Sequence, residues 1–194
     1  MKQIIFPLLL LAATALNCTA QQPKQETYQQ IDTVATVYMT RDISPESLVR
    51  IYKALGVKAK GRVAIKISTG ESNKTNHLRP DFISPLVNEV NGTLVECNTA
   101  YGGSRSTTEA HMKAISERGY DKIAKVDIMD ADGSMELPVR DTTWIKTNLV
   151  GSHLANYDFM INLAHFKGHQ MGGFGGVLKN QSIGIASADG KASL

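Results

Sequence analysis

The stretch from His165 to Asn180 carries the residues of this sequence that are best suited to chemistry. Two imidazoles, His165 and His169, and two ammonium groups, Lys167 and Lys179, surround five glycines. Glycine accepts positive φ and lets a ligand approach backbone N–H groups closely. Histidine can transfer a proton or hold a metal, and lysine can hold an anion or form a covalent bond. The stretch therefore predicts a site for a small anionic substrate or a metal cofactor.

We expect proton transfer or other catalysis to rest on His165, His169 and Lys179, and a metal, whose identity stays open, to be held by His165 and His169. The candidate substrate-binding residues are cations, polar groups and glycines in or beside loops, namely Lys66, His77, Arg79, Asn98, Lys167, Gly173, Gly175 and Gly176. A flexible glycine linker is the simpler alternative, and for His77 a solvated loop histidine is an equally good interpretation. The glycines match neither a dinucleotide fingerprint nor a P-loop.

Several other reactive residues are interpreted as structural. Cys97 ends a predicted strand and is expected to be a small buried apolar residue rather than a nucleophile. His111 is expected on a helix surface, and His153 at the end of the sheet opposite the loops. The run 127–133 is rich in aspartate, but Ile128 occupies a position where a calcium loop needs an oxygen ligand.

The composition is that of a globular protein. The chain has 194 residues, of which 42% are hydrophobic and 20% charged, so disorder and collagen-like structure are excluded. The formal charge of +3 is spread along the chain without a basic run, and we therefore expect no nucleic-acid partner. Two cysteines do not make a disulfide scaffold.

Strand and helix patterns alternate along the chain and must position these residues. Helices are expected from Pro45 to Gly56, from Pro80 to Asn91, and from a capping box at Ser106 and Glu109 to about Gly119. Strands are expected at 34–39, 61–67, 93–97, 123–129 and 157–164. This alternation predicts an α/β fold, a mostly parallel sheet with crossover helices. Ligands bind such sheets beyond the carboxyl ends of the strands, so the loops after the second, third and fifth strands should meet at one edge.

The first 20 residues have the pattern of a signal peptide, and residues 21–33 form a polar tether. Lys2 precedes an apolar run that is too short to span a bilayer, and small residues follow up to Ala20. Cleavage after Ala20 would release the protein to the periplasm, whereas acylation of Cys18 would anchor it to the membrane by a lipid. Export is expected in both cases. An ordinary buried first helix is the remaining alternative.

Four stretches, 64–71, 76–80, 95–103 and 165–180, are similar to the bacterial family known as domain of unknown function 362, and the resemblance covers about residues 35–190. Members of that family continue well beyond this length, so the resemblance implies that residues 34–194 are an incomplete domain, truncated at its carboxyl end. Such a domain would expose apolar surface and self-associate.

A shorter resemblance concerns His169 and Lys179 alone, which flank Gly-Phe-Gly-Gly at a spacing similar to that of the nickel-pincer lactate racemases. It implies proton transfer by His169 and cofactor anchoring by Lys179. However, the proline-glycine pair that follows the lysine in those enzymes is missing. Two hypotheses result: an exported enzyme that acts at this loop, or a noncatalytic binding protein or inactive remnant of one.

Overall fold

The computed structural model describes residues 34–71, 77–170 and 172–193. The unit that spans residues 37–194 is compact and holds every described helix and strand. The predicted signal peptide, 1–20, and the predicted polar tether, 21–33, lie outside the described residues. Among the described helices, none combines the length and hydropathy that a bilayer span requires.

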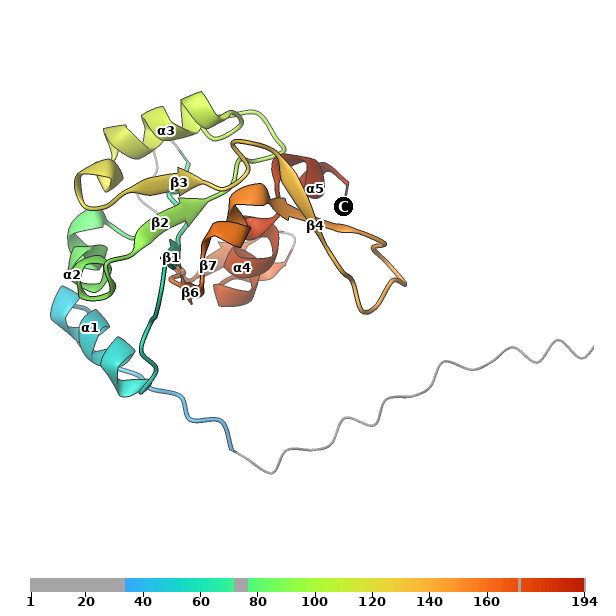
Figure 1. The fold of residues 1–194 in the computed structure, drawn as a ribbon. Helices are drawn as coiled ribbons and strands as arrows, with labels where there is room; N and C mark the ends of the chain where they lie inside the picture. Colours follow the sequence, from blue (N-terminus) through green and yellow to red (C-terminus); the bar gives the residue numbers. More distant parts are fainter. Residues whose placement is uncertain (1–33, 72–76, 171, 194) are drawn as a thin grey trace, which may run out of the picture. The chain divides into compact units, whose positions relative to one another are not determined.

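A four-stranded parallel sheet forms the centre of the domain, as predicted (Figure 1). Its strands are β1 (Val63–Lys66), β2 (Thr93–Glu96), β3 (Val126–Ile128) and β6 (Phe159–Asn162), in the order β3-β2-β1-β6. In register, Ile65 of β1 lies between Leu94 of β2 and Ile161 of β6. The chain therefore extends the sheet away from β1 on one side and then returns to add β6 on the other.

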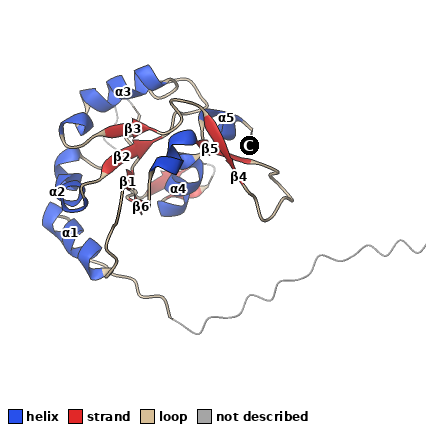
Figure 2. Ribbon diagram, in the orientation of Figure 1, coloured by secondary structure: helices blue, strands red, loops and turns tan. Residues whose placement is uncertain are grey.

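Helices connect and cover these strands (Figure 2). They are α1 (Pro45–Ala54), α2 (Pro80–Val90), α3 (Thr108–Glu117), α4 (Val177–Ile185) and α5 (Ala188–Ala192), with 3-10 turns η1 (Tyr120–Lys122) and η2 (Ser152–Asn156). Ser44 caps α1 by accepting a hydrogen bond from the Ser47 backbone. The predicted capping box is wrong by one residue, because Thr107 caps α3 by accepting from the backbone N–H of Ala110.

The two faces of the sheet bury different groups. On one face Ile65 and Ile67 pack with residues of α2, α3 and η1 in an apolar cluster that includes Ile83, Val87, Leu94, Ile115, Tyr120 and Ile128. On the other face a smaller cluster of Ala64, Val95, Cys97 and Met129 contacts Ile185 of α4. Successive strand residues point to opposite faces, so β1 supplies Ile65 to the first face while its neighbours Ala64 and Lys66 point to the second.

Two sequence predictions are corrected here, and one hairpin was missed. Residues 34–39 form no strand and are exposed, although their β-branched composition suggested one. A hairpin of β4 (Ser134–Leu137) and β5 (Asn148–Gly151) was not predicted. The stretch predicted as a loop folds into a second hairpin, β7 (Lys167–His169) with β8 (Gly173–Gly175), and then into α4. Gly173, the first residue of β8 after the turn, has a φ of 72°, a backbone conformation that glycine adopts readily.

Candidate functional site

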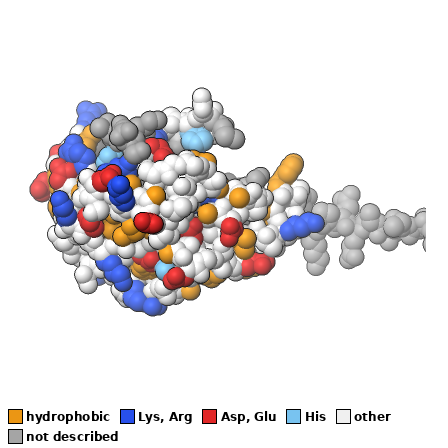
Figure 3. All heavy atoms as spheres, turned by 90° about the horizontal axis from the view of Figure 1, so that it is seen from above, with side chains coloured by type: hydrophobic (Ala, Val, Ile, Leu, Met, Phe, Trp, Pro, Cys, Tyr) orange, Lys and Arg blue, Asp and Glu red, His pale blue; other side chains and the backbone are white. Residues whose placement is uncertain are grey.

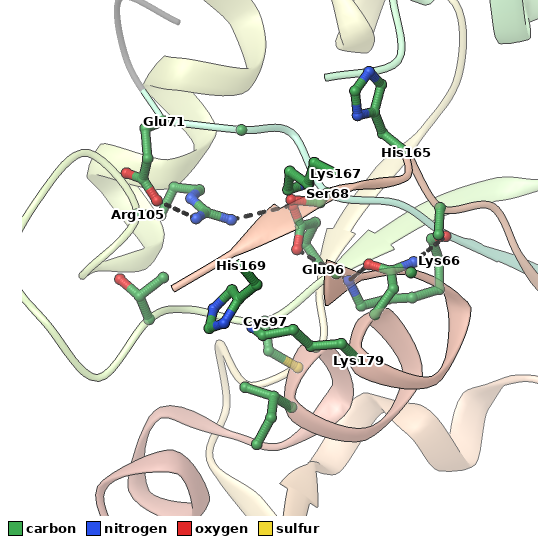
Figure 4. Close-up of a pocket in the computed structure, with 18 of the residues that line it drawn as sticks. Lys66, Ser68, Glu71, Glu96, Cys97, Arg105, His165, Lys167, His169 and Lys179 are labelled. Atoms are coloured by element: carbon green, nitrogen blue, oxygen red, sulfur yellow. Dashed lines mark hydrogen bonds and ion pairs between the residues drawn. The ribbon is translucent and has the colours of Figure 1, made fainter. Parts of the chain in front are cut away.

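A cavity of about 250 Å³ lies at the carboxyl ends of β1, β2 and β6 (Figure 4). The predicted loops all contribute to it: Ser68 follows β1, Thr99 follows β2 and His165 follows β6. The hairpin β7–β8 and the start of α4 complete the wall with Lys167, Gly175 and Lys179 among others. We call this space the cationic cavity, because five of its lining residues are Lys or Arg, namely Lys66, Arg105, Lys167, Lys179 and Lys191.

The topology explains why a cavity forms here. After β1 the chain passes to α2, which packs in the apolar cluster on one face of the sheet. The neighbouring strand β6 leads instead to α4, whose Ile185 contacts the other face. Connections that leave two adjacent parallel strands toward opposite faces open a crevice at the carboxyl ends of those strands. Lys66 and His165 lie on the two sides of this crevice.

Lys66 is buried, with 1% of its side chain exposed, and forms an ion pair with Glu96, whose oxygen lies 3.1 Å from Nζ. The ammonium also donates to the backbone oxygen of Ile67 and to Asn180 Oδ1 of α4. The contact with α4 is close, because a Cβ on Gly184 would lie 2.8 Å from Lys66 Cε. Lys66 is therefore enclosed and fully hydrogen-bonded, and forms part of the cavity wall.

Glu96 is the buried anion of the site. Burial alone would raise the pKa of its carboxyl, but the cations Lys66 and Arg105 and the Thr69 backbone N–H lower that pKa to about 2. Thr69 donates to Oε1 from both its backbone N–H, at 2.6 Å, and its hydroxyl, at 3.0 Å. Arg105 pairs with Glu71 as well and lies 3.7 Å from Glu96 Oε1. Both carboxylates of the cavity are thus neutralised by cations of the same site.

The prediction that His111 lies on the helix surface is wrong: the side chain has no exposed area. Its Nδ1 lies 3.2 Å from Asn98 Oδ1 and its Nε2 lies 3.3 Å from the Thr69 hydroxyl. Burial lowers the pKa of His111 to about 4, so the ring is neutral at pH 7. His111 therefore supports Thr69 and, through Thr69, the Glu96 carboxylate.

Two cations of the cavity remain without such partners. Within the described parts of the chain, the ammonium groups of Lys167 and Lys179 form no hydrogen bond or ion pair. A Cβ on Gly175 would lie 3.7 Å from Lys167 Cγ and 3.8 Å from Lys179 Cδ, so both side chains run alongside this glycine. Burial, together with the charges of Arg105 and Lys179, lowers the pKa of Lys167.

The two predicted histidines have different surroundings. His169 Nδ1 accepts a hydrogen bond from the Gly172 backbone at 3.0 Å, which leaves the proton of the neutral ring on Nε2. The Nδ1 of His165 is buried and has no hydrogen-bond partner among the residues described. Figure 4 shows His169 and Lys179 pointing toward the same space beside Cys97, whereas the ring of His165 lies apart from them.

The structure brings together most of the residues that the sequence singled out. Seven of them line the cationic cavity, namely Lys66, His165, Lys167, His169, Gly175, Gly176 and Lys179. Four do not. Arg79 is exposed and pairs with Asp81, and Asn98 is hydrogen-bonded to Thr108 and His111. His77 packs near Tyr120, and Gly173 begins strand β8.

Sequence reasoning missed four charged residues of the site, namely Glu71, Glu96, Arg105 and Lys191. Glu96 had a detectable signal, because a carboxylate within an otherwise apolar strand is rarely buried without a partner. Lys191 could not be inferred, since it reaches the site from α5, where its ammonium donates to the backbone oxygens of Asn98 and Ala186 at 2.6 Å each. Burial lowers the pKa of Lys191.

The surroundings of Cys97 and His153 indicate structural roles. Cys97 is buried, as the sequence predicted, and burial raises the pKa of its thiol to about 12, which makes it a poor nucleophile. His153 lies beside the carboxyl end of β3, with its backbone N–H on Met129, rather than at the opposite end of the sheet. Its ring bridges Asp127 and Asp132 at 2.8 and 2.7 Å.

Metal-ligating side chains are few around the cavity. The described residues contain no group of three His, Cys, Asp or Glu side chains arranged to hold a metal ion. His165 and His169 both line the cavity, but its carboxylates are bound to cations. The donor set thus favours an anion over a metal.

Comparison with known protein families shows to which family the chain belongs. The family model described as domain of unknown function (DUF362) matches residues 63–194. The chain belongs to this family. The match begins at β1 and includes every strand of the central sheet and all residues that line the cationic cavity. Neither the curated proteins nor the solved structures contain a match.

Proposed function

We propose that this DUF362 domain binds a small anion in the cationic cavity, with Lys167 and Lys179 as its principal contacts. The observation that carries the proposal is the imbalance of charge. Five cations line the cavity against two carboxylates, so the Lys, Arg and Glu side chains alone give an excess of three positive charges. The carboxylates already have partners, whereas Lys167 and Lys179 have none among the described residues.

Three other features support binding of an anion. His169 can donate from Nε2, because its Nδ1 accepts from Gly172. The cavity reaches Gly175 and Gly176, where α4 begins, and the first-turn N–H groups of a helix carry partial positive charge. The surroundings are also partly desolvated, and at an effective dielectric constant of about 20 a charge pair 4 Å apart gains roughly 4 kcal/mol.

The experiment is calorimetric titration of the purified chain with oxalate and with phosphate, and with neutral oxamide for comparison. We expect the anions to bind and oxamide not to bind. Lys167→Gln and Lys179→Gln should each weaken anion binding at least tenfold. Lys113→Gln on the exposed surface of α3 removes the same charge outside the cavity and should leave binding unchanged. Equal affinity of all three variants, or no anion binding by the parent chain, would contradict the proposal.

A second measurement tests whether the cavity holds a metal instead of an anion. Elemental analysis of the purified chain and of His165→Ala and His169→Ala variants reports any bound metal directly. Stoichiometric metal in the parent chain that is lost in His169→Ala would contradict the anion site and indicate a metal site instead. Metal-free protein that still binds oxalate is the expected result.

We also propose that the chain is exported. The support is the charged, apolar and small-residue order of residues 1–20. Fractionation of expressing cells, followed by mass determination of the amino terminus, tests it. A terminus at Gln21 is expected for signal peptide cleavage, a lipid-bearing Cys18 for a membrane anchor, and Cys18→Ala separates the two. A full-length chain retained in the cytoplasm would refute export.

A further inference from the structure

A second cavity, of about 600 Å³, adjoins the cationic cavity and shares four of its lining residues, namely His169, Gly176, Lys179 and Ile183. Its other lining residues include Phe174 of β8 and Leu178 of α4. We call it the apolar groove. The shared residues make the two spaces continuous, with the ammonium-bearing chain of Lys179 on the boundary between them.

The apolar residues at this groove are unusually exposed. Leu178 has 80% of its surface exposed and Phe174 57%, and Phe166, with 73% exposed, stacks on Phe174 at a ring separation of 5.6 Å. Val177 and Ile183 of α4 are exposed as well. A contiguous apolar patch on a folded surface marks a site of binding, because its exposure costs free energy that only a ligand or partner recovers.

The position of this patch decides what it would bind. On the face seen in Figure 3, basic side chains are interspersed with acidic ones, as on an ordinary solvated surface. At the groove, by contrast, apolar side chains open directly beside the ammonium group of Lys179, which is unpaired among the described residues. A ligand that satisfies both must carry a negative group at one end and an apolar chain at the other.

We infer that the two cavities together bind a single-chain amphiphilic carboxylate, whose head group lies in the cationic cavity and whose alkyl chain lies on Phe174, Leu178 and Ile183. This inference rests on the proposed function, because it takes the carboxylate to be the anion held by Lys167 and Lys179. The combined space falls in the range of roughly 300–1,000 Å³ that is typical of small-molecule sites.

The test is a titration series with the straight-chain carboxylates acetate, butyrate, hexanoate and octanoate at monomeric concentrations. If the chain is buried in the groove, each added methylene should tighten binding up to about fourfold, as apolar transfer predicts. Octan-1-ol, which has the chain without the charge, should bind at least tenfold more weakly than octanoate. Equal affinity along the series, or equal binding of octanol and octanoate, would overturn the inference.

Matched variants separate this inference from the proposed function. Leu178→Ser and Phe174→Ser should flatten the chain-length series while oxalate still binds as in the parent chain. Leu178 is 80% exposed, so its replacement should leave the fold intact. Trp144→Ser removes an exposed aromatic residue elsewhere, 90% exposed, and should change nothing. Failure of oxalate binding refutes the proposed function, whereas oxalate binding with a flat series refutes only the inference.

The same variants and ligands also test two other occupants of the apolar groove. Chain self-association at the groove would appear as a concentration-dependent mass in sedimentation that Leu178→Ser abolishes and octanoate leaves unchanged. Binding to a membrane surface would appear as cosedimentation with phosphatidylglycerol vesicles in the absence of octanoate binding. Either result would overturn the amphiphile as the ligand.

Discussion

The two faces of the central sheet differ in what they bury. The face covered by α2 and α3 buries an apolar cluster around Ile65 and Ile115. The face toward α4 has a smaller apolar cluster, and the carboxyl edge of the sheet carries the ion pair of Lys66 with Glu96 and the cationic cavity. Apolar packing is favourable without specific partners, whereas buried charges must each find one. Stability should therefore be most sensitive to single changes at the polar edge.

The largest expected effect comes from Lys66→Ala. It leaves the Glu96 carboxylate buried without its principal cation, and removal of one partner of a buried pair costs about 3–5 kcal/mol of unfolding free energy. Urea denaturation measures this loss. The double variant Lys66→Met with Glu96→Gln should lose less unfolding free energy than the sum of the losses in Lys66→Met alone and Glu96→Gln alone, because no unpaired charge remains. Strict additivity of the two changes would show that the pair does not act as a unit.

A smaller effect is expected from acid. The folded pKa of His111 is about 4, below its ordinary value of 6.5, so the unfolded chain binds the proton first as the pH falls. The stability due to neutral His111 is complete above pH 6.5 and declines toward pH 4, by on the order of 2–3 kcal/mol. Melting curves across this range should show the decline, and His111→Gln should remove most of it.

His153 serves as the control for that pH dependence. Its hydrogen bond with Asp127 raises the pKa of His153 against the opposing effect of burial. The stability it contributes is present below pH 6.5 and is lost as the pH rises through its folded pKa. His153→Gln should therefore leave the acid decline intact. A variant that abolishes the decline would assign it to His153 instead.

On the apolar face, the loss of a single methyl group should matter less. Ile115→Val removes one buried methyl group and should cost about 0.5–1.5 kcal/mol by chemical denaturation. Anion binding should stay as in the parent chain, because Ile115 lies in the apolar cluster and not in the cavity wall. Loss of oxalate binding in Ile115→Val would show that the two faces are coupled.

The smallest effect on stability is expected at Lys167. Its chemical reactivity can instead be compared with that of an exposed lysine. Its lowered pKa leaves more neutral amine near pH 8 than an ordinary exposed lysine has. Limited acetylation followed by peptide mass mapping should label Lys167 ahead of the exposed Lys113. Oxalate should protect Lys167 and leave Lys113 unaffected. Labelling of both at the same rate would contradict a perturbed Lys167.

Much of the fold could be predicted locally. Helices α1 and α2 begin at Ser-Pro and Arg-Pro steps and end at or just before a residue that favours turns, so their bounds were close. The parallel sheet followed from short apolar strands separated by helices. The hairpin β7–β8 was missed, because its strands are only three residues long and are rich in glycine, which has low strand propensity. The strand expected at 34–39 fails because strand propensity without a neighbouring strand does not make a sheet.

The sequence by itself determined the family, the α/β class and the gathering of His169, Lys167 and Lys179 near the carboxyl edge of the sheet. These follow from short-range patterns and from the rule that parallel strands carry their binding loops at one end. Only the tertiary structure decided which cations stay unpaired. Glu96, Arg105 and Lys191 come from distant segments, and whether a charge is neutralised depends on which opposite charge lies within a few ångströms of it, which spacing along a chain does not specify.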